Sequence, residues 1–216
     1  MNVSRRLLLV AGMMTATTRI VAAQKPTNQF WPELDVYWTP AEHQRTFLEI
    51  SSSADQDGPK REDSIGLYQD YLRLPAAYFR GGFRYTRSAN DNSYREYRIV
   101  GEATLETWAN GLLRLVNRSR LEIRDVNDAW SYRIRDRLHL QRHAAGPTRL
   151  ALAPYVTFEA YYYSQYRTIA KLGARVGSEA RIYGPASVDL YIARQNNSRT
   201  TPKYVNALGL TVKLTY

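Results

Sequence analysis

The sequence predicts an all-β fold: an up-and-down antiparallel transmembrane β-barrel of about 10–12 strands. Three observations support it. The last nine residues, LGLTVKLTY, alternate apolar residues with small or polar ones; the chain from Leu34 onward reads as extended segments separated by turn residues; and no run approaches the roughly 20 apolar residues of a membrane helix. The mean hydropathy of −0.49 is compatible with a barrel, because only every second residue of each strand meets lipid.

The C-terminal strand has two distinct faces. One face carries Leu208, Leu210, Val212, Leu214 and Tyr216, and the other carries Gly209, Thr211, Lys213 and Thr215. This ending resembles the strand that outer-membrane barrels present to their assembly machinery. We therefore expect the barrel-assembly machinery to be a partner of this chain. The expected assembly signal consists of Leu208, Gly209, Leu210, Val212, Leu214 and Tyr216. An ordinary edge strand is the alternative.

The N-terminus predicts export. Arg5 and Arg6 precede an apolar run, and Val21-Ala22-Ala23 offers small residues before a cleavage point, so residues 1–23 read as a secretory signal peptide. Residues 24–216 are then a single barrel domain, located in the bacterial outer membrane. Removing the signal takes three arginines from the 30 basic residues and none of the 20 acidic ones, which leaves a formal charge of +7.

The basic charge narrows the choice of partners. There is no basic tail, zinc-ligand spacing or helical recognition pattern, so nucleic acid is not expected. Outer-membrane lipid, the phosphates of lipopolysaccharide and small anionic solutes are the expected partners. Cysteine is absent, which excludes disulfides, thiolate metal sites and cysteine nucleophiles. No cofactor is expected.

Eleven candidate strands follow in order, separated alternately by short turns such as Ala109-Asn110-Gly111 and by longer polar loops. They are Phe30 to Trp38, Gln44 to Ser53, Ser64 to Arg73, Ala77 to Arg87, Tyr94 to Trp108, Leu112 to Arg124, Trp130 to Arg142, Thr148 to Tyr162, Thr168 to Val176, Arg181 to Gln195 and Tyr204 to Tyr216. A bacterial barrel with both termini in the periplasm needs an even number. We therefore expect ten strands, with the first segment not spanning, or twelve.

The central strands suggest a strand register. Pairing Tyr94–Trp108 with Leu112–Arg124 across the 109–111 turn brings opposite charges together on one face. The predicted pairs are Glu106 with Arg114, Glu102 with Arg118, Arg98 with Glu122, and Glu96 with Arg124. A turn near Val126-Asn127 then pairs apolar residues of the next hairpin: Ile123 with Trp130, Leu121 with Tyr132, Leu115 with Leu138, and Leu113 with Leu140.

The charged face predicts a lumen lined by interleaved arginine and glutamate. Its expected residues are Glu96, Arg98, Glu102, Glu106, Arg114, Arg118, Arg120, Glu122, Arg124, Arg133, Arg135 and Arg137. Such a lumen could conduct ions or be closed by its own ion pairs. A barrel of about ten to twelve strands favours the narrow or closed form, because wide aqueous channels belong to barrels of about 16 strands or more.

One polar notch interrupts the apolar face. The predicted register places Asn117 opposite Asp136, with Ser119 next along the strand and Gly101 and Ala103 on the adjacent strand. A carboxylate facing lipid is costly, so the notch could mark an oligomer contact, a lateral opening or a water defect. A β-bulge that turns Asp136 inward is the alternative.

Catalytic and metal-binding patterns are missing from the sequence. The three histidines, His43, His139 and His143, form no H-E-x-x-H or comparable metal-binding motif, and no Ser–His–acid set is visible around Ser131 or elsewhere. We therefore expect a non-enzymatic barrel, either a narrow channel or a structural and surface component. An outer-membrane enzyme acting on lipid or lipopolysaccharide, and a soluble lipocalin-like barrel, remain as alternatives.

Several segments together resemble a bacterial family known as domain of unknown function 2490. They are FWPELDVYW near residue 30, NRSRLEIRDVNDAWSYRIRDRLHLQR (Asn117 to Arg142), APYVTFEAYYYSQY (Ala153 to Tyr166) and RQNNSRTTPKYVNALGLTVKLTY (Arg194 to Tyr216). The resemblance covers nearly everything after the predicted signal. It implies an outer-membrane-type β-barrel and carries no activity, substrate or catalytic residue. Residues 125–128 and Asp136 depart from the family pattern.

Overall fold

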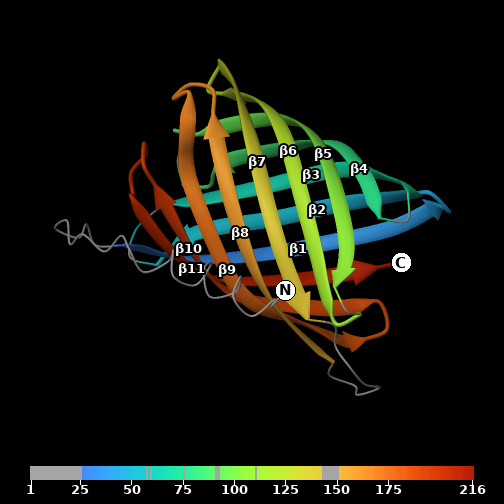
Figure 1. Cartoon of the computed structure of the whole chain (residues 1–216). Helices are drawn as coiled ribbons and strands as arrows, with labels where there is room; N and C mark the ends of the chain where they lie inside the picture. The colour runs from blue at the N-terminus through green and yellow to red at the C-terminus, as the bar shows by residue number, and fades with distance from the viewer. Residues whose placement is uncertain are drawn as a thin grey trace, which may run out of the picture.

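The computed structural model describes residues 26–56, 58, 60–74, 76–90, 93–109, 111–142 and 151–216. The predicted signal peptide and His143 lie outside these residues. The described chain forms one closed β-barrel of eleven strands, so the predicted all-β barrel is confirmed (Figure 1). No helix in the described residues is long and apolar enough to cross a membrane.

The strands are 12–16 residues long and follow one another around the barrel. They are β1 (Thr27–Ala41), β2 (Gln44–Asp55), β3 (Arg61–Leu74), β4 (Ala77–Ser88), β5 (Arg95–Ala109), β6 (Leu113–Val126), β7 (Ala129–Arg142), β8 (Leu152–Tyr163), β9 (Thr168–Tyr183), β10 (Ala186–Asn197) and β11 (Tyr204–Thr215). Consecutive strands pair antiparallel, as expected where short connections join neighbours.

The expectation of an even strand number was wrong. The barrel closes through a parallel pair, β1 with β11, whose register runs from Thr27 opposite Val205 to Tyr37 opposite Thr215. An even number is needed only when every neighbouring pair is antiparallel, and a parallel ladder satisfies the backbone groups of both edges as well. The start of β1 and the end of β11 therefore lie at opposite ends of the barrel.

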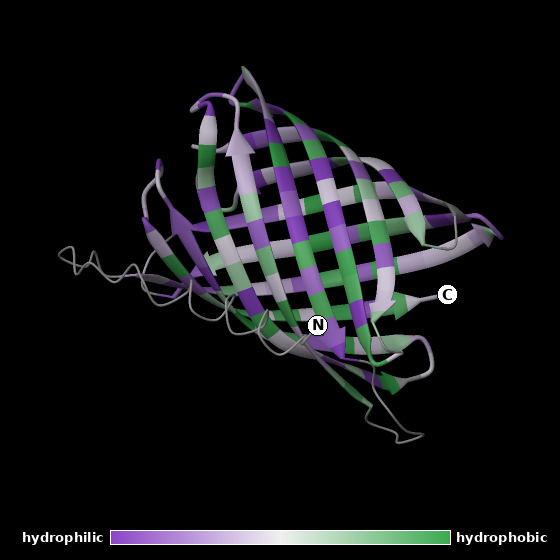
Figure 2. Cartoon of the chain, in the orientation of Figure 1, coloured by the Kyte–Doolittle hydropathy of each residue, from purple (hydrophilic) through white to green (hydrophobic). Residues whose placement is uncertain are grey.

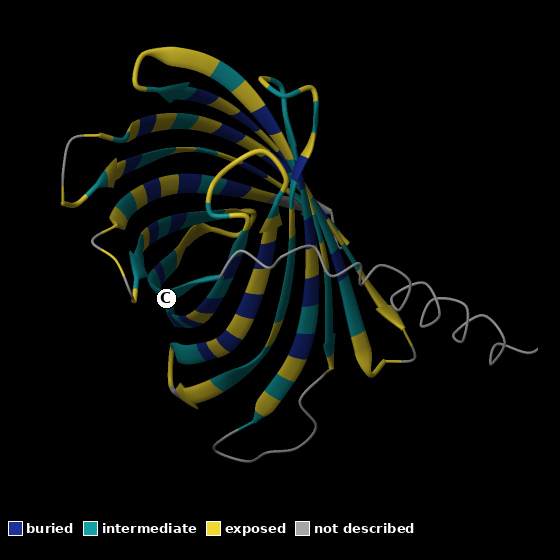
Figure 3. Ribbon diagram, turned by 90° about the vertical axis from the view of Figure 1, so that its left-hand side faces the viewer, coloured by how far each residue is buried: buried dark blue, intermediate teal, exposed yellow. Residues whose placement is uncertain are grey.

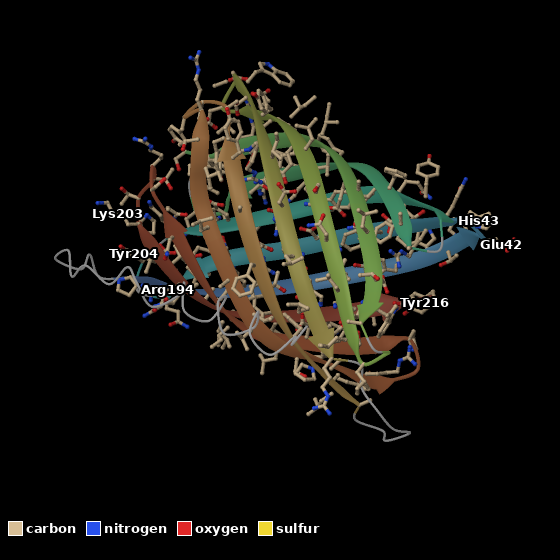
Figure 4. All side chains as sticks on the ribbon, viewed as in Figure 1. Glu42, His43, Arg194, Lys203, Tyr204 and Tyr216 are labelled. Atoms are coloured by element: carbon tan, nitrogen blue, oxygen red, sulfur yellow. The ribbon has the colours of Figure 1, made fainter. Side chains whose placement is uncertain are left out.

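The side-chain view identifies the two ends of the barrel. Tyr216 lies at the same end as Glu42 and His43 of the β1–β2 turn, whereas Lys203 and Tyr204 lie at the other end (Figure 4). We call these the Tyr216 end and the Tyr204 end. Long strands thus connect two separate rims.

The boundary between β9 and β10 differs from the prediction. The expected break between Val176 and Arg181 lies inside β9, and the turn falls instead at Gly184, whose φ is +51°. Glycine adopts this left-handed backbone conformation without the steric penalty that other residues meet. The predicted first residues of the eighth strand, from Thr148, lie outside the described residues, and β8 begins at Leu152.

The barrel wall carries many of its large apolar side chains on the outside and charged side chains on the inside, which is the reverse of a soluble barrel. Polar and apolar residues alternate along the visible strands, and burial alternates clearly in β5, β7 and β10 (Figures 2 and 3). Large apolar side chains are exposed on the outer face, among them Ile65, Leu67, Phe79, Phe83, Ile99, Leu105, Leu121, Ile134, Val176, Leu190, Ile192 and Leu208. The interior instead buries charged residues such as Asp70, Glu96 and Glu122. The lipocalin-like alternative, which required an apolar interior, is therefore wrong.

Two interior tyrosines are seated on glycines of their own and adjacent strands. The ring of Tyr68 covers Gly66 and Gly82, and the ring of Tyr191 covers Gly209, while the Tyr191 Cβ lies over Gly177. A Cβ on any of these glycines would lie within 3.0 Å of the tyrosine. Tyr68 also stacks on Phe47, with ring centroids 5.2 Å apart. These contacts fill part of the lumen with aromatic rings.

Candidate functional site

The predicted lumen residues lie on the inner face of the barrel. Those that are buried are Glu96, Glu102, Arg120, Glu122, Arg124 and Arg133, and those that are partly exposed are Arg98, Glu106, Arg114, Arg118, Arg135 and Arg137. They belong to the middle strands β5, β6 and β7, whose period of two sends alternate side chains inward. The sequence thus places the charged face, although its detailed pairing differs.

The predicted register of β5 and β6 was wrong by two residues. The structure sets Glu102 opposite Arg120 and even places Arg98 opposite Arg124. The reason is the turn, in which Gly111 (φ +65°) is the central residue where Asn110 was expected. Moving the turn centre by one residue shifts every pair by two and keeps each side chain on its face.

Three of the four predicted ion pairs nevertheless form, as diagonal contacts. Arg114 Nη2 lies 2.6 Å from Glu106 Oε2, and Arg118 Nε lies 3.3 Å from Glu102 Oε1. Arg124 pairs with Glu96. The long arginine side chain reaches the carboxylate one pair further along the neighbouring strand, which the distance between diagonal positions allows.

The β6–β7 register was wrong in the same way. Asn127 and Asp128 form the turn with φ values of +49° and +67°, so the turn centre lies one residue beyond the predicted one. The observed partners are Ile123 with Tyr132, Leu121 with Ile134, Leu115 with Leu140 and Leu113 with Arg142.

The polar notch lies on the outer face, with different partners from those predicted. Ser119, and not Asn117, is opposite Asp136, and its hydroxyl donates a hydrogen bond of 2.5 Å to Asp136 Oδ1. The β6–β7 register is continuous and Asp136 is exposed, so the β-bulge alternative was wrong. Ala103 and Ala160 flank the pair on β5 and β8. A serine and a carboxylate therefore interrupt the apolar exterior.

If the outer face lies in lipid, as the sequence predicts, replacing Asp136 with leucine should raise the free energy of unfolding in phospholipid vesicles by about 1 kcal/mol or more, because a carboxylate in hydrocarbon is costly. Urea titration followed by tryptophan fluorescence measures the change. Asp63→Leu is the matched control: Asp63 is an outward carboxylate near a strand end that already pairs with Arg61 at 3.0 Å, and it should change stability little. A loss of stability on Asp136→Leu, with a change of oligomeric state, would instead indicate a contact between copies.

Interior carboxylates are shared by several arginines. Glu159 accepts hydrogen bonds from Arg135 at 2.8 Å and Arg137 at 2.5 Å, and Arg175 Nη2 lies 3.6 Å away. The Tyr161 hydroxyl donates a further bond of 2.5 Å to the same carboxylate. Such shared, charge-assisted bonds hold several guanidinium groups in fixed positions.

The same sharing occurs along β5 and β6. Glu102 contacts Arg118, Arg120 and Arg80, and Glu122 contacts Arg133 and Arg120. Near the Tyr204 end, Tyr94 donates to Glu96. Burial, together with the Glu96 carboxylate, raises the pKa of Tyr94 to about 12, so this hydroxyl keeps its proton at neutral pH.

A cavity of about 340 Å³ lies inside the barrel and has one mainly cationic wall. The basic residues of β4–β9 that line it are Arg80, Arg84, Arg98, Arg118, Arg120, Arg133, Arg135, Arg137, Lys171 and Arg175. The acidic residues Glu33, Asp35, Glu49, Glu62 and Asp189 face it from β1, β2, β3 and β10. The cavity is therefore polar on all sides, with arginine predominating.

A second interior cavity of about 180 Å³ adjoins the first. Residues that line both are Arg118, Arg137, Arg175, Asp189 and Lys213. The second cavity adds Arg114, His139 and Glu179. Together the two cavities follow the interior of the barrel for part of its length.

Sequence reasoning missed part of this site. Glu33 and Asp35 alternate with apolar residues in β1, so period-two patterning could have placed them inside. Glu159, Lys171 and Arg175 follow the same alternation in β8 and β9. Their contacts, however, depend on strands that are distant in sequence, which patterning within one strand does not specify.

The structure does not assemble a hydrolase or metal site among the described residues. His139 Nδ1 lies 2.8 Å from Thr157 Oγ1, and its partner on β6 is Val116. No cluster of three His, Asp or Glu residues in the described ranges could hold a metal ion. The arrangement suits electrostatic binding of charged solutes.

The fold and the site define an eleven-stranded closed β-barrel with an apolar exterior and an arginine-rich interior. Comparisons with protein-family models, with curated proteins and with solved structures found no match.

Proposed function

We propose that this chain is an outer-membrane β-barrel whose lumen is a narrow, arginine-lined path for small anionic solutes. The observation that carries the proposal is the inversion of the wall, with apolar side chains outside and paired charges inside. In lipid, an apolar outer band is stable and every backbone group must be paired within the protein, which a closed barrel achieves.

The exposed apolar side chains support the membrane part of this proposal. Ile192 is 65% exposed and Leu105 is 59% exposed, on opposite sides of the strand order, and similar residues lie on the strands between them. An apolar surface this continuous around a soluble monomer would favour aggregation. The signal peptide and the resemblance to domain of unknown function 2490 stay predictions that point the same way.

The lumen supports a narrow path rather than a wide pore. The two adjoining cavities are small, and the aromatic stack of Tyr37, Phe47 and Tyr68 fills the interior beside them. Arginine predominates in the lining, which favours anions over cations.

We expect the protein to fractionate with the outer membrane and to migrate faster on a denaturing gel when unboiled. In planar bilayers under a KCl gradient, the reversal potential should indicate selectivity for chloride. Arg118→Glu, which places a carboxylate where both cavities meet, should reduce or reverse that selectivity.

Arg95→Glu is the matched control. Arg95 lies exposed at the Tyr204 end, where it pairs with Asp128 at 3.0 Å, so its replacement should leave the reversal potential nearly unchanged. Absence of the protein from the outer membrane would refute the membrane assignment. Absence of conductance with correct insertion would refute the path and indicate a plugged barrel.

A further inference from the structure

Three cationic groups surround one buried tyrosine in the wall of the larger cavity. The ring centroid of Tyr161 lies 4.9 Å from Lys171 Nζ, 5.1 Å from Arg135 Cζ and 5.4 Å from Arg133 Cζ. All four residues line the cavity. The aromatic face partly offsets the crowding of positive charge. We call Tyr161, Lys171, Arg133, Arg135 and Arg175 the Tyr161 cluster.

Arg175 extends the cluster along β9. It lies on the inner face with Lys171, and its Cζ is 5.0 Å from the Tyr191 ring centroid and 5.9 Å from Trp31. Gly173 lies between the two cations, directly opposite Glu159. A Cβ at Gly173 would lie 3.8 Å from Glu159 Oε2, so the glycine makes room for this carboxylate, and both cations line the cavity.

The carboxylates that pair with the cluster are not among the residues that line the cavity. Glu159 binds Arg135 and Arg175, and Glu122 binds Arg133, but neither glutamate lines the cavity. The surface that a solute would meet on this side is therefore cationic and aromatic. The carboxylates fix the arginine side chains in place without covering their cavity-facing sides.

Lys171 is the exception within the cluster. Among the residues that the structure describes, no carboxylate lies within 4.0 Å of its ammonium group, whereas the other lumen lysine, Lys213, pairs with Glu179 at 2.6 Å. Two arginines approach the same ring as Lys171. Repulsion among these cations would be relieved by an anion held between them.

We propose that the Tyr161 cluster binds a small solute that carries a multivalent oxyanion, such as a phosphate group. Guanidinium groups match the oxygens of such an anion through paired N–H donors, and Lys171 adds a compact charge. The cavity volume of about 340 Å³ accommodates a small phosphorylated solute. The proposal deepens the proposed function and rests on it in one respect, that the lumen admits solutes.

Trp31 provides a reporter for this site, because it lines the cavity next to Arg175. A parent variant that carries Trp38→Phe, Trp108→Phe and Trp130→Phe retains Trp31 as the single tryptophan of the mature chain. In the folded, detergent-solubilised barrel, iodide should quench Trp31 more strongly than caesium does. Inorganic phosphate, titrated at constant ionic strength, should protect Trp31 from iodide.

Lys171→Gln should weaken the protection by phosphate at least about tenfold. Because no carboxylate of the described residues pairs with Lys171, the substitution leaves no carboxylate unpaired, and the variant should fold. Lys213→Gln is the matched control and should change phosphate affinity less than about threefold, because its charge is already paired.

The proposal is overturned if phosphate protects no better than chloride at equal ionic strength, or if the two lysine variants lose protection equally. The measurement needs neither membrane insertion nor conductance. A failure of phosphate binding in a barrel that still conducts chloride would remove this site alone. A barrel that binds phosphate but does not fractionate with the outer membrane would instead refute the proposed location.

Discussion

Glu159→Leu is expected to lower the free energy of unfolding by about 3–5 kcal/mol. The substitution removes the carboxylate that holds Arg135, Arg137 and Arg175 and accepts the Tyr161 hydroxyl. Glu159 is only 4% exposed, and the three arginines are partly buried, so they would be left in the lumen without their counter-ion. Denaturant unfolding of the barrel in phospholipid vesicles, followed by the shift between folded and unfolded bands on a gel, measures this loss.

Glu106→Leu is the control for that experiment. Glu106 pairs with the single residue Arg114, and both side chains are partly exposed near the Tyr216 end. Solvent screens this pair, so its removal should cost about 1 kcal/mol or less. Equal losses in the two variants would mean that the shared network around Glu159 adds nothing to an ordinary exposed ion pair.

Gly82→Ala is expected to destabilise the barrel by about 2 kcal/mol, the range found for overpacked cores. A Cβ at this position would lie 2.5 Å from the Leu67 carbonyl oxygen and 2.4 Å from Tyr68 Cδ1. The first of these contacts is with backbone, so rotating the tyrosine side chain would not remove it. The same vesicle unfolding experiment measures the change.

The preceding residue gives an internal comparison. Gly81 lies on the outer face of the same strand, and a Cβ there meets nothing within 4 Å. Gly81→Ala should therefore be neutral or slightly stabilising, since alanine loses less conformational entropy than glycine on folding. If both variants unfold at the same denaturant concentration, the seating of Tyr68 on Gly82 does not contribute to stability.

Sequence reasoning predicted which face each side chain occupies better than which residue it pairs with. Faces follow from a period of two along one strand, and a register error of two residues leaves them unchanged. Pairs depend on the turn centre, and at both Gly111 and Asn127–Asp128 that centre lies one residue beyond the predicted position. The left-handed backbone at Gly111, Asn127 and Asp128 fixes the turn centre, and glycine, asparagine and aspartate are the residue types that favour this conformation.

The closure of the barrel could not be predicted in the same way. The parallel pair, with Thr27 opposite Val205, joins segments from the two ends of the described chain. No short turn connects these two strands, so the sequence offers no turn residue from which their register could be predicted. The sequence contains eleven candidate strands, but an all-antiparallel barrel needs an even number, and we therefore expected ten or twelve. The Tyr161 cluster has a similar origin, because it gathers residues of β7, β8 and β9 whose cross-strand positions depend on two successive registers.

The parallel pairing of β1 with β11 also restricts how this chain could be circularly permuted. In a barrel with an even number of antiparallel strands, the first and last strands have their free ends at one rim, so a short linker can circularly permute the chain. Here β11 has 12 residues, which at about 3.3 Å per residue extend over roughly 40 Å. A linker from Thr215 back to Thr27 would have to travel that distance along the wall, so the strand order of this barrel tolerates new termini only together with a long crossing segment.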